Sequence, residues 1–155
     1  MSEKIRIERT YRATLQEVWD LWTTKAGFES WWGPVGFRVD VRALDARVGG
    51  ALHYDMIAAT PEMIALMKEQ GQPASHETRG TFSELRPMER LAITHVIDFI
   101  PGVAAYESTI TVELARQGEH VTMRVLLDRM HDDATTAMQE EGFSSQLTKL
   151  DARFG

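Results

Sequence analysis

Two side chains on apolar, strand-like segments could bring polar chemistry into a hydrophobic interior. His95 follows Ile93 on one alternating apolar face, and Tyr54 lies between Leu52 and Met56 on another. Apolar faces of antiparallel strands normally look inward. His95 is then either a hydrogen-bonded core residue or a polar anchor for a ligand, with a ring that titrates. Tyr54 could add a hydroxyl group to the same anchor.

A second polar group joins the last strand-like segment to the final helical one, in the run Met130-His131-Asp132-Asp133. A histidine beside two carboxylates could act as a general base or bind a metal. Alternatively, Asp132 or Asp133 caps the helix, because acidic residues suit a helix N-terminus, and His131 is a loop residue.

The sequence lacks the residues that most other kinds of catalytic or metal site require. The chain has no cysteine, which excludes a thiol nucleophile, a disulfide framework and a thiolate zinc site. Its five histidines show no close ligand spacing, and no serine elbow, P-loop or dinucleotide glycine fingerprint is present. We therefore expect no metal and no cofactor.

Aromatic and flexible side chains complete the candidate site. Trp31 and Trp32 are adjacent and cannot easily point the same way, so we expect one in the core and Trp32 near a pocket, beside Phe37. Methionines suit an adaptable pocket because they are flexible and polarizable. The candidate ligand-binding residues are Trp32, Phe37, Leu52, Tyr54, Met56, Ile93, His95, Met130 and Phe143.

Hydrophobic periodicity indicates the elements that position these residues. Thr14 and Glu17 have the spacing of a helix capping box. Thr60 and Pro61 suit the start of a short apolar helix. The pattern predicts strands at 4–11, 35–41, 52–56, 76–85, 90–99, 105–114 and 120–128, and helices starting at 14, 25, 60 and 132.

This order predicts an α+β fold in one domain spanning residues 1–155, with a helical insertion at about 60–75. A curved antiparallel sheet would wrap around the long C-terminal helix, with two short helices after the first strand. Any part of the concave face that the long helix leaves uncovered becomes a cavity. The apolar insertion would act as a lid or a dimer contact.

Composition narrows the class of partner. Hydrophobic residues make up 43% of the chain and charged residues 26%, values typical of a globular domain. A formal net charge of −6 without a basic stripe disfavours nucleic acid and anionic membranes. No apolar run is long enough to cross a bilayer, and no targeting segment precedes the first strand, so we expect a cytoplasmic protein without membrane insertion.

Several short motifs, in order, resemble the Hsp90 ATPase activator homologue family, in particular its bacterial members. They are Arg9-Thr10-Tyr11-Arg12-Ala13, Val18-Trp19, Trp31-Trp32-Gly33-Pro34, Gly49-Gly50, Glu89-Arg90-Leu91 and Gly142-Phe143. The resemblance implies the helix-grip fold of the START-like superfamily, also called Bet v 1-like or SRPBCC. Many relatives carry Gly-Trp where this chain has Gly142-Phe143. Nothing here resembles the additional N-terminal domain of the eukaryotic activator.

The leading functional hypothesis is a non-catalytic binding protein for a small apolar or amphipathic molecule. The first alternative is an enzyme of the same superfamily, a hydrolase, cyclase or dehydratase, with His95 or His131 as acid or base. The second is a chaperone-linked interaction protein that uses its outer surface. A homodimer is compatible with each hypothesis.

Overall fold

A computed structural model describes residues 4–98, 100 and 102–154. Within them, seven strands form one antiparallel sheet in the order β1-β7-β6-β5-β4-β3-β2. The strands are β1 (Ile5–Tyr11), β2 (Phe37–Leu44), β3 (Ala51–Ala58), β4 (Ser75–Arg86), β5 (Arg90–Ile97), β6 (Tyr106–Gln117) and β7 (His120–Leu127). The helices are α1 (Leu15–Thr23), α2 (Lys25–Glu29), α3 (Pro61–Glu69) and α4 (Asp133–Phe154).

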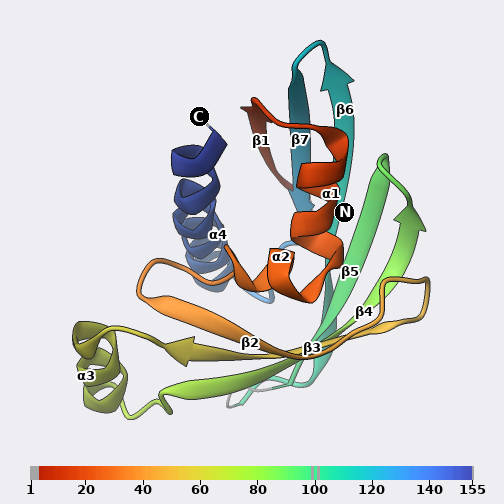
Figure 1. Ribbon diagram of the computed structural model, residues 1–155. Coiled ribbons are helices and arrows are strands. Elements are labelled where there is room, and N and C mark those ends of the chain that lie inside the picture. Colours follow the sequence, from red (N-terminus) through yellow and green to blue (C-terminus); the bar gives the residue numbers. More distant parts are fainter. Residues whose placement is uncertain (1–3, 99, 101, 155) are drawn as a thin grey trace.

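The sheet curls around the longest helix. Figure 1 shows α4 along the hollow side of the sheet, with α1 and α2 beside it, while α3 projects from the far end of the β2–β4 hairpins. The strands from β2 to β7 follow one another as a meander, and β1 pairs with β7 as an edge strand of the sheet. The predicted α+β helix-grip architecture is confirmed.

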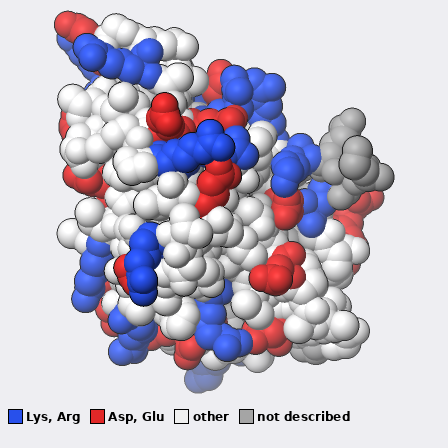
Figure 2. Space-filling model, turned by 90° about the vertical axis from the view of Figure 1, so that its right-hand side faces the viewer, with Lys and Arg blue, Asp and Glu red and all other residues white. Residues whose placement is uncertain are grey.

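The outer face of the sheet carries paired charges. Arg90 contacts both Glu84 at 2.9 Å and Glu113 at 2.6 Å, and Arg124 lies 3.2 Å from Glu8. These pairs link neighbouring strands through half-exposed side chains. Figure 2 shows basic and acidic residues interspersed on one face of the molecule, without a large patch of one sign. The opposite, hollow face of the sheet is therefore the apolar one.

Local sequence signals explain where the helices begin. The Thr14 hydroxyl accepts from the Glu17 N–H and the Glu17 carboxylate accepts from the Thr14 N–H, so the predicted capping box is present at the start of α1. Thr60 caps α3, and Pro61 occupies its first position. Within α2, Gly27 lies close against the end of α1, and a Cβ atom at Gly27 would stand 2.0 Å from the Asp20 carbonyl oxygen.

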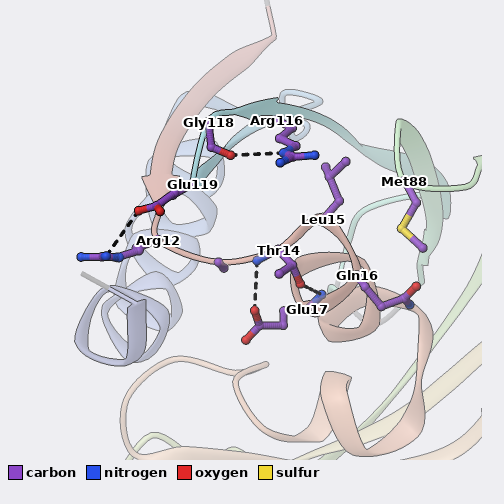
Figure 3. A pocket seen from close by; sticks show the side chains of 10 residues that line it. Arg12, Thr14, Leu15, Gln16, Glu17, Met88, Arg116, Gly118 and Glu119 are labelled. Carbon is purple, nitrogen blue, oxygen red and sulfur yellow. Dashed lines mark hydrogen bonds and ion pairs between the residues drawn. The ribbon is translucent and has the colours of Figure 1, made fainter.

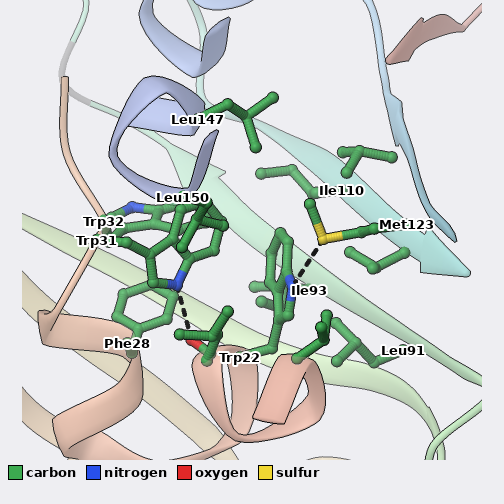
Figure 4. Close-up of a cluster of buried hydrophobic side chains, with 14 of the residues drawn as sticks. Trp22, Phe28, Trp31, Trp32, Leu91, Ile93, Ile110, Met123, Leu147 and Leu150 are labelled. Carbon is green, nitrogen blue, oxygen red and sulfur yellow. Dashed lines mark hydrogen bonds between the residues drawn. The ribbon is translucent and has the colours of Figure 1, made fainter. Parts of the chain in front are cut away.

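Aromatic side chains from α1, α2 and the following loop fill one half of the hollow. Trp22 is fully buried and its indole N–H donates to the Met123 sulfur at 3.4 Å. Trp31 is also fully buried and donates to the Leu21 carbonyl oxygen at 2.9 Å. Figure 4 shows these rings gathered with Phe28 and with aliphatic side chains of the sheet. Their burial anchors α1 and α2 on the sheet.

Two local features were not visible in the alternation. The strand register shifts between Val41 and Ala43 and again between Phe82 and Glu84, as β-bulges. The strand predicted at 90–99 ends at Ile97 in the structure, and Phe99 lies outside the described residues.

Candidate functional site

A pocket of about 530 Å³ lies between the sheet and α4, in the half of the hollow that α1 and α2 leave open. Its floor comes from β3, β4, β5 and β6, one wall from α4, and its rim from the loops before β2 and after α3. Pockets of roughly 300–1,000 Å³ with mostly apolar walls are typical of small-molecule sites.

A buried hydrogen-bond chain crosses the floor of this pocket. The Trp32 indole N–H donates to the Tyr54 hydroxyl at 3.0 Å. The Tyr54 hydroxyl lies 3.1 Å from His95 Nε2. All three side chains are at least nine-tenths buried. Because an indole N–H can only donate, the Tyr54 oxygen accepts it. Between Tyr54 and His95, the tautomer of the imidazole decides which group donates.

Burial controls the ionisation of this chain. Removal from water lowers the pKa of His95 from 6.5 to about 4, so the ring is neutral at neutral pH. The same cause raises the pKa of Tyr54.

A glycine on the neighbouring strand makes room for the imidazole. Gly80 pairs with His95 across β4 and β5. A Cβ atom at Gly80 would lie 3.3 Å from His95 Cδ2 and 3.2 Å from the Thr94 carbonyl oxygen. These distances are shorter than ordinary contacts, so the absence of a side chain at Gly80 leaves room for the His95 ring in this position.

The α4 wall combines apolar and amide side chains. Phe143 is buried, and Gly142 leaves space next to Pro34, since a Cβ atom there would lie at an ordinary 3.6 Å from Pro34 Cγ. Gln146 is 3% exposed, and its Oε1 accepts a hydrogen bond from the Gly33 N–H at 2.8 Å. Among the described residues, Gln146 Nε2 and Gln139 Oε1 are buried without a hydrogen-bond partner.

Sequence reasoning missed both glutamines. Gln146 follows Phe143 by three residues and Gln139 precedes it by four, so all three share one helix face. Two polar residues on the buried seam of a long helix are the signal that could have identified them, because buried amides need partners.

The structure brings most of the predicted site residues around the one pocket. Those that line it are Trp32, Phe37, Tyr54, Met56, His95, Met130 and Phe143. Leu52 and Ile93 do not line it; both are fully buried in the core cluster that contains Trp22 and Phe28. The aromatic rings of α1 and α2 cover that part of the sheet, which leaves no open surface over these two residues.

The segment that contains His131 leads into the N-terminus of α4. Asp132 Oδ1 accepts from the Thr135 N–H at 2.7 Å, so Asp132 caps α4. The His131 Nδ1 atom lies 2.9 Å from the Tyr106 hydroxyl, near the end of the pocket at Met130. The capping interpretation of this segment is therefore confirmed. Over the described part of the chain, no cluster of three or more acidic or histidine side chains could hold a metal ion.

A second pocket, of about 690 Å³, lies on the surface where the β1–α1 connection meets the β6–β7 turn. Figure 3 shows its polar groups engaged with one another: the Thr14–Glu17 capping box, the Arg12–Glu119 ion pair and the Arg116 bond to the Gly118 carbonyl oxygen. These contacts are ordinary caps, turns and exposed ion pairs. The pocket beneath α4 is therefore the candidate site.

No Lys, Arg, Asp or Glu is among the described residues that line the α4 pocket. The nearby Lys149 ammonium group donates to the carbonyl oxygens of Gly33 at 2.8 Å and Phe37 at 3.4 Å, holding the rim loop against α4. None of the helices in the described ranges is long and apolar enough to span a bilayer.

Comparison with known proteins shows which proteins this chain is similar to. The family model described as Activator of Hsp90 ATPase homolog 1-like protein matches residues 12–155. Comparison with curated proteins gives no match.

Solved structures share the whole fold. A Chromobacterium violaceum protein is 25% identical, with a TM-score of 0.80 over 99% of this chain and 98% of that one. The AHSA1 protein from Silicibacter pomeroyi is 20% identical, with a TM-score of 0.75 over 97% and 96% of the two chains. A Nitrosomonas europaea protein is 21% identical, with a TM-score of 0.71 over 97% and 92%. The last two similarities show the fold alone.

Proposed function

The chain belongs to the activator of Hsp90 ATPase homolog 1-like family, and from this premise we propose that it binds a small apolar or amphipathic molecule in the α4 pocket, without catalysis. The helix-grip fold of this family, START-like or Bet v 1-like, commonly binds hydrophobic ligands. The observation that carries the proposal is the pocket of about 530 Å³ left beside a fully packed aromatic core.

Apolar burial supplies the affinity in this proposal. Aliphatic and aromatic side chains together form most of the lining, including Met56, Met130 and Phe143. At about 25 cal/mol per Å², a ligand that buries roughly 250 Å² of apolar surface gains about 6 kcal/mol before the costs of association. Methionines let the walls adjust to the shape of the ligand.

Acid–base catalysis in the same pocket has less support. A histidine with a pKa of about 4 is a weak general base at neutral pH, because efficient bases have a pKa near the operating pH. No carboxylate lines the pocket within the described residues to raise the basicity of His95. A chaperone-linked role rests on the family description, and no feature of the described surface specifically favours it.

Native mass spectrometry of protein purified from its own host tests the proposal. We expect a co-purifying small molecule with wild-type protein. Gly142→Leu should abolish it, because the new side chain projects from α4 beside Pro34 at the pocket wall. Ala137→Leu is the matched control, since it places the same side chain on the exposed face of the same helix.

The result that would overturn the proposal is a clean apo mass together with no thermal shift from a broad panel of lipids and aromatic compounds. Retention of the molecule by folded Gly142→Leu protein would place binding elsewhere.

A further inference from the structure

We infer that the α4 pocket selects an electrically neutral ligand with a hydrogen-bond acceptor, such as a ketone or ester oxygen, placed against Gln146. This inference rests on the proposed binding function and names the chemical class of its ligand. It starts from the one fully buried amide group of the pocket whose nitrogen has no partner in the described chain.

The orientation of Gln146 is fixed by the backbone. The Gly33 N–H lies 2.8 Å from the Gln146 side chain and can only donate, so the oxygen must face Gly33 and the nitrogen must face away from it. Lys149 holds the Gly33 carbonyl oxygen at 2.8 Å, which keeps this loop in place. The free Nε2 is therefore a donor on the pocket wall, and a ligand acceptor would satisfy it.

A buried donor without a partner has a cost that a ligand can remove. Leaving such a group unpaired is unfavourable, whereas adding its partner restores a hydrogen bond in a dry site. A ligand that carries an acceptor should therefore bind more tightly than a hydrocarbon of the same shape. The difference should be about tenfold, as for one net hydrogen bond.

Neutrality follows from the groups that surround the ligand. The titratable side chains lining the pocket are Tyr54 from β3, His76 from β4 and His95 from β5, and His95 is neutral through burial. A carboxylate would lose its hydration without a lysine or arginine in the described lining to compensate for it.

Lys149 is the cation closest in sequence to Gln146 on α4. It is outside the pocket lining, and its ammonium group is engaged with two backbone carbonyl oxygens. Partial burial lowers the pKa of Lys149, because removal from water disfavours the charged ammonium group. Lys149 therefore holds the rim loop and is not free to neutralise a ligand.

Three isosteric probes test this inference by calorimetric titration at pH 7.5: 2-acetylnaphthalene, 2-naphthoate and 2-isopropenylnaphthalene. They carry a neutral acceptor, an anion and no acceptor on the same ring system. A second pair, 2-undecanone and decanoate, repeats the comparison on an alkyl chain. We expect the ketones to bind at least about 30-fold more tightly than the carboxylates, because an acid of ordinary pKa near 4 is almost fully ionised at this pH.

Two glutamine variants locate the acceptor. Gln146→Met should reduce the preference for 2-acetylnaphthalene over 2-isopropenylnaphthalene from about tenfold to about one. Gln139→Met is the matched control and should keep the preference, since a ketone has no donor for the Gln139 oxygen. Circular dichroism would establish that both variants fold.

Different results would contradict the neutral-ligand inference and the proposed binding function. Equal or tighter binding of the carboxylates would overturn the neutral-ligand inference while leaving the binding function intact, and loss of that binding in Lys149→Met would identify the counter-charge. An unchanged ketone preference in folded Gln146→Met would overturn the role of Gln146. No binding of any probe to wild-type protein would overturn both.

Discussion

Replacing Tyr54 with phenylalanine removes a single oxygen atom from the centre of the pocket floor. The Trp32 indole N–H and His95 Nε2 would each lose the hydroxyl that they now contact at 3.0 and 3.1 Å. Both partners are more than nine-tenths buried, so neither gains full hydration in exchange.

The expected cost follows from these two orphaned groups. Each buried unsatisfied group costs about 1–3 kcal/mol, so losing the partner of both groups should lower the free energy of unfolding by about 2–6 kcal/mol. For a domain of this size, that corresponds to a Tm lower by roughly 4–24 °C. Urea denaturation followed by circular dichroism would measure the free energy directly.

A double-mutant cycle tests the mechanism of this cost. His95→Leu should destabilise the Tyr54→Phe variant by at least about 1 kcal/mol less than it destabilises the wild-type protein, because Tyr54→Phe has already removed the Tyr54–His95 hydrogen bond. Tyr106→Phe is the control, since its hydroxyl contacts the water-accessible His131 and its loss should cost less than about 1 kcal/mol. A Tyr54→Phe variant within about 0.5 kcal/mol of wild type would refute the reasoning.

Three further predictions concern His95 and two glycines. The pKa of His95 is about 4 in the folded protein and near 6.5 in the unfolded chain, so between these pH values the unfolded chain binds one more proton. The contribution of His95 to the free energy of unfolding should be fully present above about pH 6.5 and should fall by about 3 kcal/mol towards pH 4. A His95→Phe variant should lack this contribution in denaturation measured as a function of pH. Gly142→Ala should raise stability by up to about 1 kcal/mol, since the new Cβ atom meets Pro34 Cγ at an ordinary 3.6 Å; a lower Tm would contradict this. Gly27→Ala should destabilise by about 3 kcal/mol, because its Cβ atom would lie 2.0 Å from the Asp20 carbonyl oxygen; an unchanged urea midpoint would count against that packing.

The helices and strands of this fold depend on interactions between residues close together in the chain, which is why the sequence predicts them well. The capping pair Thr14 and Glu17 and the Thr60-Pro61 start each depend on residues within one helical turn. The alternation of Ile5 and Ile7 with Arg6 requires only that one face of β1 is buried. Such signals are complete within a few residues.

The boundary between core and pocket is a property of the assembled molecule. Leu52 and Tyr54 share one strand face, yet the structure buries Leu52 in the core and places Tyr54 at the pocket. The difference arises because α1 and α2 cover one part of the hollow and not the other. Alternation reports which face is inward and carries no information about what lies opposite each residue.

Gln146 illustrates the same limit from the polar side. Its position on the α4 seam was visible in the sequence, but its partner Gly33 is 113 residues away. Only the folded chain shows that the oxygen of this amide is used and its nitrogen is not.

The four tryptophan indole N–H groups offer the most direct test that the α4 pocket is a binding site. In ¹⁵N-labelled protein titrated with 2-acetylnaphthalene, the Trp32 indole resonance should shift progressively and saturably, because this N–H lies in the pocket floor and donates to Tyr54. The indole resonance of Trp19, which is outside the pocket lining, should stay in place. A Trp32 resonance that does not move at saturating probe, or backbone shifts centred on Arg12 and Glu119 at the second pocket, would contradict the account.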